Sequence, residues 1–442
     1  MKKIVIVGGG VAGLSCGHIL AEAGFPVVIL EKERDTGGLA RTFTYGDFIF
    51  DIGPHRFFTT NDRVLRFITD TLDDDYLTID RRSGVHFLSQ YHLWPLRLKS
   101  VFLLPPLVAV QAFIDIFAKE FAAHPPGEEQ SFEDYVLRKY GKTLYSTFFR
   151  DYTQKFIGIA GHETHADWAK IGVERATISK KITTGSLFLI LRTMLLPLPE
   201  KTKFIYPRKG CQVFCDNLRE KIRAKGGEVH LSAAPVKITR EGGTVTSVTA
   251  AGSDFEVDTL FWSGRLDDLY GLLGLEGLSL SYLSLMLYNV ELRKLPRYRF
   301  QWCYFGAKDI IFSRVTDPLL FSPDTAPRGK GGLCVEVTAS EGNEVWRDPE
   351  KFKDRVISDL VKVKMIGSRD EVQAVHIEPI PAAYPVYRVD YQEHLAKAKE
   401  TLAPFKNLTL FGRTGLFWYN NMDHSIENVF EVTDRFLGEK KP

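Results

Sequence analysis

The sequence predicts an α/β fold: a Rossmann-like dinucleotide-binding domain with an inserted mixed substrate domain, part helical and part antiparallel sheet. Three observations predict this arrangement. Residues 2–31 read as a strand, a glycine-rich turn, a helix and a second strand, which is the unit that binds dinucleotides. Residues 96–199 are apolar with helical spacing, and residues 279–336 alternate apolar and polar side chains as antiparallel strands do.

The first turn has the spacing G-x-G-x-x-G, with Gly8, Gly10 and Gly13. The first glycine permits a tight turn, the second lets backbone approach a pyrophosphate, and the third lets the helix pack close to the strand. The apolar run Ile4–Val7 before the turn reads as a buried strand. We expect a helix over 11–23, whose free N-terminal N–H groups favour an anion.

Glu31 follows the second apolar run, Val27–Leu30, and lies 18 residues after Gly13. An acid at this position can accept hydrogen bonds from ribose hydroxyls. The alternative is a glycine-rich turn in some other βαβ unit. Because the strand, the helix and the acid all occur in register, the dinucleotide reading is favoured.

A second glycine-rich turn follows, in which Gly37 and Gly38 precede Arg41. Backbone and a guanidinium can there approach the same phosphate pair from the other side. After an expected strand at 48–50, Gly53 and Pro54 indicate a loop that passes close to a flat ligand.

Length, charge and cysteine content limit the other classes of protein that this chain could belong to. The chain has 442 residues, which suggests two or three domains, and 44% hydrophobic and 25% charged residues are typical of a soluble globular protein. The formal net charge is +2 and no basic run stands out, so nucleic-acid binding is not expected. The five cysteines form no C-x-x-C pair, so we expect reduced thiols in a cytoplasmic protein and no metal site.

Neither a signal peptide nor a spanning helix is expected. No uninterrupted run of about 20 apolar residues occurs. The nearest stretches are Val101–Phe117 and Ser186–Pro199, and both contain polar or charged interruptions. We expect buried helices of the second domain there; the alternatives are peripheral membrane contact and a hydrophobic tunnel.

The fingerprint, the segment GGLARTFTYGDFIFDIGPHRFF and the motif GRTGLFWYNNMDHS at 412–425 resemble the FAD-dependent amine oxidase and protoporphyrinogen oxidase superfamily. Within it, the branch that holds UDP-galactopyranose mutase is most similar. The resemblance implies FAD rather than NAD as the cofactor. The residues it assigns to FAD are Gly8, Gly10, Val11, Ala12, Gly13, Glu31, Lys32, Gly38, Leu39, Ala40, Arg41, Gly53, Pro54, His55, Val236, Gly412, Arg413, Asn421 and Met422.

Two of these assignments have alternatives. The resemblance implies that the backbone of Val236 meets the adenine, and a plain strand valine is compatible with that role because only its backbone is used. It also implies that His55 lies against the flavin face. There its titration near neutral pH would make it sensitive to the flavin redox state. The alternative for His55 is an ordinary loop histidine.

The resemblance also implies a substrate site. Arg314, Tyr384 and Tyr419, with Arg413 beside them, resemble residues that hold the substrate diphosphate in the mutase branch. Arginine contacts phosphate in a bidentate manner, and tyrosine hydroxyls add donors without charge. The alternatives are a surface arginine at a strand edge and aromatic core residues with satisfied hydroxyls.

The chain departs from the mutase branch on the nucleotide-sugar side. Ile157 stands where that branch has a tryptophan. Trp168 is kept, but the arginine expected shortly after it falls near Gly172, and Arg175 could replace it only with a shift of helix register.

The leading functional hypothesis is an FAD-dependent oxidoreductase of protoporphyrinogen oxidase or amine oxidase type. A small-molecule substrate, anionic if Arg314 and Arg413 contact it, would give a hydride to flavin N5, with His55, Arg314, Tyr384 and Tyr419 as site residues. There is one dinucleotide fingerprint, so electrons would come from the substrate or an outside reductant.

The alternative is a mutase-like isomerase, in which reduced FAD attacks the anomeric carbon of a nucleotide sugar. A flavin-bound protein without catalysis is a third hypothesis. The expected domains are a discontinuous FAD domain (1–95, 200–278 and 374–442), a helical insertion (96–199) and a substrate-domain sheet (279–373).

Overall fold

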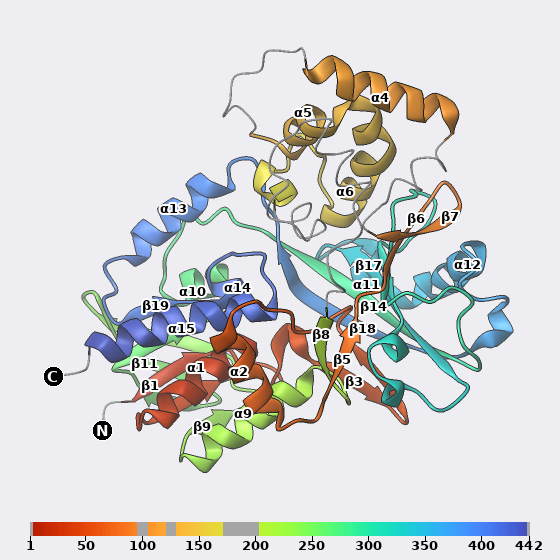
Figure 1. The fold of residues 1–442 in the computed structure, drawn as a ribbon. Coiled ribbons are helices and arrows are strands. Elements are labelled where there is room, and N and C mark those ends of the chain that lie inside the picture. The colour runs from red at the N-terminus through yellow and green to blue at the C-terminus, as the bar shows by residue number, and fades with distance from the viewer. Residues whose placement is uncertain (1–2, 95–104, 121–129, 171–202, 440–442) are drawn as a thin grey trace. The chain divides into compact units, whose positions relative to one another are not determined.

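The structure is a computed structural model that describes residues 3–94, 105–120, 130–170 and 203–439. The chain divides into two compact units, each assembled from separated segments (Figure 1). The first unit comprises residues 1–79, 204–280 and 393–442, and the second comprises 80–203 and 281–392.

A five-stranded sheet forms the centre of the first unit, in the order β19-β13-β1-β2-β9, and its pairs are parallel. Its strands are β1 (Ile4–Val7), β2 (Val27–Leu30), β9 (Glu228–His230), β13 (Thr259–Trp262) and β19 (Leu408–Leu410). All eight residues of β1 and β2 are buried, as expected of parallel strands covered on both faces. The predicted Rossmann-like fold is therefore confirmed.

Three helices pack together in this unit. Helix α1 (Val11–Glu22) contacts both α9 (Gln212–Ala224) and α15 (Met422–Glu439). The predicted helix over 11–23 agrees with α1 to within one residue. Gly24 follows it with a φ of 84°, a conformation that favours glycine at a helix end.

The remaining elements of the first unit surround this sheet. They are η1 (Gly38–Ala40), β3 (Thr42–Tyr45), β4 (Phe48–Asp51), α2 (Asp62–Leu72), β5 (Tyr76–Asp80), β8 (Lys203–Pro207), β10 (Pro235–Glu241), β11 (Thr244–Ala250), β12 (Ser253–Glu256), α10 (Leu266–Leu272), α13 (Tyr391–Leu402) and α14 (Gly412–Gly415). Residues 228–241 are divided between two sheets: β9 joins the parallel sheet and β10 an antiparallel one. The break occurs where the N–H groups of Ser232 and Ala233 donate to the carbonyls of Glu33 and Glu31.

A seven-stranded sheet forms the second unit, in the order β18-β14-β17-β16-β15-β6-β7. Its strands are β6 (Ser83–Phe87), β7 (Gln90–Trp94), β14 (Tyr282–Leu292), β15 (Trp302–Phe305), β16 (Arg314–Thr316), β17 (Gly331–Ala339) and β18 (Val372–Pro385). All its pairs are antiparallel except β6 with β15, so the predicted antiparallel sheet is confirmed. Residues 83–94 and 374–385, expected in the FAD domain, pair here instead.

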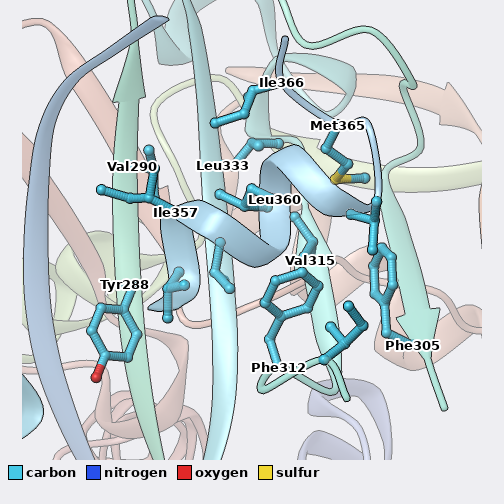
Figure 2. Packing of buried hydrophobic residues seen from close by; sticks show 14 of the residues in the cluster. Tyr288, Val290, Phe305, Phe312, Val315, Leu333, Ile357, Leu360, Met365 and Ile366 are labelled. Carbon is cyan, nitrogen blue, oxygen red and sulfur yellow. The ribbon is translucent and has the colours of Figure 1, made fainter. Parts of the chain in front are cut away.

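The hydrophobic core of the second unit lies on one face of this sheet. Helix α12 (Lys353–Lys362) covers that face, and Ile357 and Leu360 pack among Tyr288, Val290 and Leu333 (Figure 2). Strand β14 is buried along almost its whole length, including the polar residues on its opposite face. One face is therefore an apolar core. The opposite face, called the polar face below, is also buried and carries Asn289 and Glu291 beside the leucines of β14.

The helical part consists of α4 (Pro106–Glu120), α5 (Phe132–Leu144), the π-helical turn η2 (Tyr145–Phe149) and α6 (Arg150–Ile157). Ser131 and Asp134 form a capping box at the start of α5. The expectation of a buried helix over 101–117 is wrong for the described part, because five large apolar side chains of α4 are exposed: Leu107, Val110, Phe113, Ile114 and Phe117. The stretch 186–199 lies outside the described residues.

Short elements complete the second unit: η3 (Pro318–Leu320), η4 (Pro323–Thr325), α11 (Glu344–Arg347), η5 (Pro349–Phe352) and η6 (Arg369–Glu371). All five cysteines are free and buried, as reduced thiols are expected to be. Among the described residues, no helix has the length and apolar character needed to cross a membrane, and no group of three or more potential ligands could hold a metal ion.

Candidate functional site

The first glycine turn lies between β1 and α1, and its geometry requires glycine. Gly8 has a φ of 105°. A Cβ on Gly13 would lie 1.8 Å from the carbonyl oxygen of Gly8, so any side chain there would collide with the turn. Among the described residues, no side chain caps the first turn of α1, and no acid lies in that turn. The N–H groups at Val11 and Ala12 can therefore receive an anion.

The second glycine turn lies directly against the first. The Gly37 N–H donates to the Gly9 carbonyl at 2.8 Å, and Gly10 pairs with Gly37 in an isolated bridge. A Cβ on Gly38 would approach Gly10 Cα to 3.2 Å. The structure thus brings together the two turns that the sequence assigned to the phosphates.

Arg41 lies at the end of the second turn, after half-buried Leu39 and buried Ala40. Its Nε donates to the Gly38 carbonyl at 3.2 Å, and its Nη1 lies 3.5 Å from a Glu33 carboxylate oxygen. These contacts hold the guanidinium beside the two turns. Lys32, also assigned to FAD, is exposed.

Glu31 is buried at the end of β2. One carboxylate oxygen accepts from the Gly9 N–H at 2.5 Å and the other from the Glu33 N–H at 2.9 Å. Burial raises the pKa of Glu31, although these two N–H groups oppose the rise. A carboxylate has about four lone-pair sites, so both oxygens could still accept from ribose hydroxyls.

Val236 is 68% exposed and lies in a bulge of β10. Its neighbours Pro235 and Lys237 pair with β11, whereas Val236 has no partner in that ladder. A bulge leaves the extra residue's backbone groups outside the ladder. The backbone contact to adenine expected from the resemblance is compatible with this geometry.

The C-terminal motif lies against the start of α1. Gly412 has a φ of 72°, and a Cβ there would lie 2.8 Å from Ala12 Cβ. The Gly412 N–H donates to Asn428 Oδ1 at 2.9 Å. Met422 is the first residue of α15, and the N–H of Asn421 just before it donates to His424 Nδ1 at 3.4 Å.

Arg413 and Tyr419 are in contact. Arg413 Cζ lies 4.8 Å from the centroid of the Tyr419 ring, and Arg413 Nη1 donates to the Asn420 carbonyl at 2.6 Å. Asn420 is almost fully buried, and its Nδ2 has no partner among the described residues. This orphaned donor and the glycine turns fit a dinucleotide with a pyrophosphate and many acceptor oxygens, as FAD has.

The loop that carries His55 is anchored by buried Asp51. The Asp51 carboxylate accepts from Thr42 Oγ1 at 2.6 Å, from the Tyr206 hydroxyl at 2.8 Å and from the Cys211 N–H at 3.0 Å. Burial raises the pKa of Asp51, and these hydrogen bonds oppose the rise.

Asp51 also fixes the backbone of the loop. Its carbonyl accepts from the Gly53 N–H at 2.8 Å, and the Gly53 carbonyl accepts from the His55 N–H at 2.9 Å. Gly53 has a φ of 69°, and Pro54 is buried. The loop expected beside the flavin is therefore tightly constrained.

Arg314 and Tyr384 meet on the polar face of the seven-stranded sheet. The Arg314 Nη2 donates to the Tyr384 hydroxyl at 2.9 Å. The same guanidinium donates to both oxygens of Glu336, at 2.5 and 2.6 Å, and Glu336 is fully buried. Arg314 is thus a buried, paired arginine, and the alternative of a surface arginine is wrong.

Aromatic rings surround this ion pair. Arg314 Cζ lies 6.0 Å from the ring centroids of both Phe156 and Tyr304, and the Phe156 and Tyr384 rings are 5.3 Å apart. Burial lowers the pKa of Arg314, but Glu336 and the tyrosine hydroxyls outweigh this and raise it well above its ordinary value.

The structure describes two of the four positions discussed above as departures from the mutase branch or as residues kept from it. Ile157 and Trp168 are both buried in the second unit. Gly172 and Arg175 lie outside the described residues.

The four residues proposed for catalysis belong to two units. Arg314 and Tyr384 lie together in the second unit, and His55 and Tyr419 lie in separate segments of the first. The sequence analysis missed Glu336. An acid in the middle of the apolar strand 331–339 was the available signal, because a buried carboxylate needs a partner.

Comparison with known proteins supports the sequence interpretation. Residues 6–71 match the family model of an NAD(P)-binding Rossmann-like domain. The L-amino-acid oxidase of Crotalus adamanteus is 43% identical over 65 residues, which are 15% of this chain and 12% of that protein. The match to this oxidase therefore spans only a small part of its length.

Other similarities extend along the whole chain. A protein named "Probable UDP-galactopyranose mutase" from Klebsiella pneumoniae is 28% identical over 448 residues, covering 99% of this chain and 95% of that protein. The crystal structure of reduced UDP-galactopyranose mutase superposes with a TM-score of 0.85 at 20% identity, covering 99% and 94% of the two chains.

A protein described as "Putative protoporphyrinogen oxidase" from Exiguobacterium sp. 255-15 superposes with a TM-score of 0.78 at 16% identity, covering 99% of each chain. These two structural similarities concern the fold. Together with the glycine turns and the sequence matches, they lead to one conclusion. The chain resembles the superfamily that holds the FAD-dependent amine oxidases, the protoporphyrinogen oxidases and the UDP-galactopyranose mutases.

Proposed function

We propose that this protein binds FAD and is an FAD-dependent oxidoreductase that acts on a small-molecule substrate. The observation that carries the proposal is the pair of glycine turns in contact, Gly8–Gly13 and Gly37–Gly38, beside an uncapped helix start. Such a site offers N–H donors to a pyrophosphate from two sides.

The residues that would hold FAD follow the geometry of the first unit. The glycine turns and Arg41 would hold the pyrophosphate, Glu31 the ribose, and the Val236 backbone the adenine. Gly412 and the Asn420–Met422 segment would extend the site along the cofactor. Bound FAD supplies a hydride acceptor or, once reduced, a nucleophile.

The ion pair at Arg314 favours an oxidoreductase over a diphosphate-binding mutase. Bidentate recognition of phosphate uses two parallel N–H groups of a guanidinium. In Arg314, Nε and Nη2 both donate to Glu336, so the charge is already compensated and this edge of the guanidinium is occupied. An anionic substrate therefore gains little from Arg314.

The second candidate is the mutase-like isomerase. It is favoured by the full-length similarity to the Klebsiella pneumoniae protein and by the hydrogen bond that joins Arg314 to Tyr384. Both candidates use the same cofactor site, so cofactor binding alone does not separate them. A cytoplasmic location and peripheral membrane contact stay predictions.

An anaerobic titration separates the two candidates. The purified protein, first oxidised and then dithionite-reduced, is titrated with UDP and UDP-galactose while flavin absorbance and products are followed. For the oxidoreductase we expect no interconversion of sugar ring forms, and flavin bleaching by a hydride donor in a substrate screen. UDP binding by the reduced protein with furanose–pyranose interconversion would establish the isomerase instead. A protein purified without flavin that does not take up added FAD would refute both.

A further inference from the structure

Arg81 is a partly buried cation that no acid among the described residues compensates. It precedes β6 and is at most about one-third exposed. Its Nε donates to Ser83 Oγ at 3.1 Å, and no carboxylate among the described residues pairs with it. Its two terminal nitrogens have no hydrogen-bond partner in the described part of the chain. Burial lowers the pKa of the Arg81 guanidinium. The electrostatic interaction with Tyr304 acts in the opposite direction and raises this pKa.

The backbone on either side of Arg81 is clamped by buried Gln301. Gln301 Oε1 accepts from the Arg82 N–H at 2.8 Å, and the Arg82 carbonyl accepts from the Gln301 N–H at 2.8 Å. The Gln301 Nε2 also donates to the Asp80 carbonyl at 3.0 Å. Three hydrogen bonds from one side chain and its backbone therefore fix the residues that flank Arg81.

The guanidinium is held in place as well. Its Cζ lies 5.6 Å from the ring centroid of Trp302, and Ser83, which accepts from Nε, donates to the Trp94 carbonyl at 3.1 Å. Ser83 pairs with Trp302 in the β6–β15 ladder. An arginine stacked on a ring and oriented by a buried hydroxyl loses little conformational entropy when it binds an anion.

An orphaned hydroxyl lies beside Trp302, the residue whose ring Arg81 contacts, on the polar face. Thr316 pairs directly with Trp302, so the two side chains share one face of the sheet. Thr316 is 3% exposed, and its Oγ1 has no partner among the described residues. Buried hydroxyls are normally hydrogen-bonded, so this one indicates a partner that is not part of the described protein.

The contrast with Arg314 decides which arginine is available. Arg314 donates to both oxygens of Glu336, whereas Arg81 keeps its terminal N–H groups and its full charge. Arg299, another arginine of this unit, is paired with Asp317 at 2.8 Å. Holding a desolvated charge without a partner is costly, which is expected where a ligand supplies the partner.

We propose that Arg81, with Thr316 opposite Trp302 on the same face of the sheet, forms an oxyanion-binding subsite that holds a carboxylate or phosphate group of the substrate. The inference rests on the proposed function in that the anion belongs to that substrate. Under this proposal, Arg81 recognises the anion that the sequence analysis assigned to Arg314. Carboxylate and phosphate share the geometry that a guanidinium fork recognises, so the experiment distinguishes them.

The test is calorimetric titration of the full-length, FAD-loaded protein with inorganic phosphate, with acetate and with acetamide, the uncharged counterpart of acetate. We expect at least one anion to bind, and acetamide to bind at least tenfold more weakly than acetate if acetate is that anion. Tighter binding of phosphate assigns a phosphorylated substrate, and tighter binding of acetate assigns a carboxylate.

Variants locate the binding. Arg81→Gln should weaken binding of the preferred anion at least tenfold, and Arg81→Lys by less, because it keeps the charge but not the planar fork. Thr316→Val should weaken it severalfold. Arg82→Gln removes the same charge from the adjacent exposed residue and should change affinity less than twofold. The melting temperature of Arg81→Gln should fall little, since the variant loses the Ser83 hydrogen bond and the Trp302 contact but no ion pair with a described residue.

Three results would overturn the proposal: equal affinities of Arg81→Gln and the wild type, equal losses in Arg81→Gln and Arg82→Gln, or no anion binding by the wild type. Flavin content is measured on the same samples by absorbance. A flavin-free protein with Arg81-dependent anion binding refutes only the proposed function. A flavin-loaded oxidoreductase with unaltered Arg81→Gln binding refutes only the subsite.

Discussion

Glu336→Leu should destabilise the second unit strongly, because it leaves the Arg314 charge buried without its carboxylate. Glu336 is fully buried and the Arg314 side chain is 9% exposed, so water does not replace the lost partner. Breaking a buried ion pair on one side costs about 3–5 kcal/mol. For a unit of this size, about 2–4 °C per kcal/mol converts this to a melting temperature lower by roughly 6–20 °C.

Thermal melts of the wild type and four variants test this reasoning. Arg314→Met should cost a similar amount, and the double variant with both changes should recover most of the loss, because a pair of apolar residues leaves no buried charge. The control is Asp434→Ala, which breaks the exposed Arg63–Asp434 pair of the same 2.5 Å length; it should cost about 0–1 kcal/mol. A Glu336→Leu protein that melts within about 2 °C of the wild type would refute the buried pair.

Two further predictions concern the glycine turn and a buried histidine. Gly13→Ala should abolish FAD retention, because the new Cβ would lie 1.8 Å from the Gly8 carbonyl oxygen. The control is Gly438→Ala on α15, where a Cβ would meet no atom within 4 Å. Flavin absorbance after gel filtration measures the FAD retained by each protein. Burial lowers the pKa of His86 to about 4. Below about pH 6.5 the unfolded chain therefore binds a proton that the folded protein does not bind until about pH 4, so stability falls as pH falls through this range. His86→Phe, which can keep the ring contact to Phe305, should reduce this fall in denaturant unfolding measured between pH 7 and pH 4; an unchanged slope would contradict the assignment.

The features that were predictable from sequence depend on local chemistry. The turn at Gly8 and Gly13 follows from steric limits within a few residues, and the capping box at Ser131 and Asp134 follows from hydrogen bonds across one helical turn. The alternating pattern of 279–336 predicted strands because their core-facing side chains repeat every second residue. These signals do not depend on knowing which distant segments meet.

The features that were missed depend on distant pairing. Strand β6 lies parallel to β15, although more than 200 residues separate them in the chain, and no local pattern indicates that partner. The ion pair of Arg314 with Glu336 follows from the β16–β17 register, which sets the two residues opposite each other. The availability of Arg81 likewise depends on Gln301 and Trp302 from a remote segment.

The parallel sheet of the first unit has a consequence for the order of synthesis. Strand β1 is made at the start of the chain, but its neighbour β13 spans 259–262, and β13 pairs in turn with β19 at 408–410. While a ribosome makes the chain, β13 therefore keeps an open apolar edge until nearly all the described residues have emerged. Open strand edges of this kind pair readily with other chains. A truncation before residue 408 would make this exposure permanent, so such fragments should associate with one another rather than accumulate as folded first units.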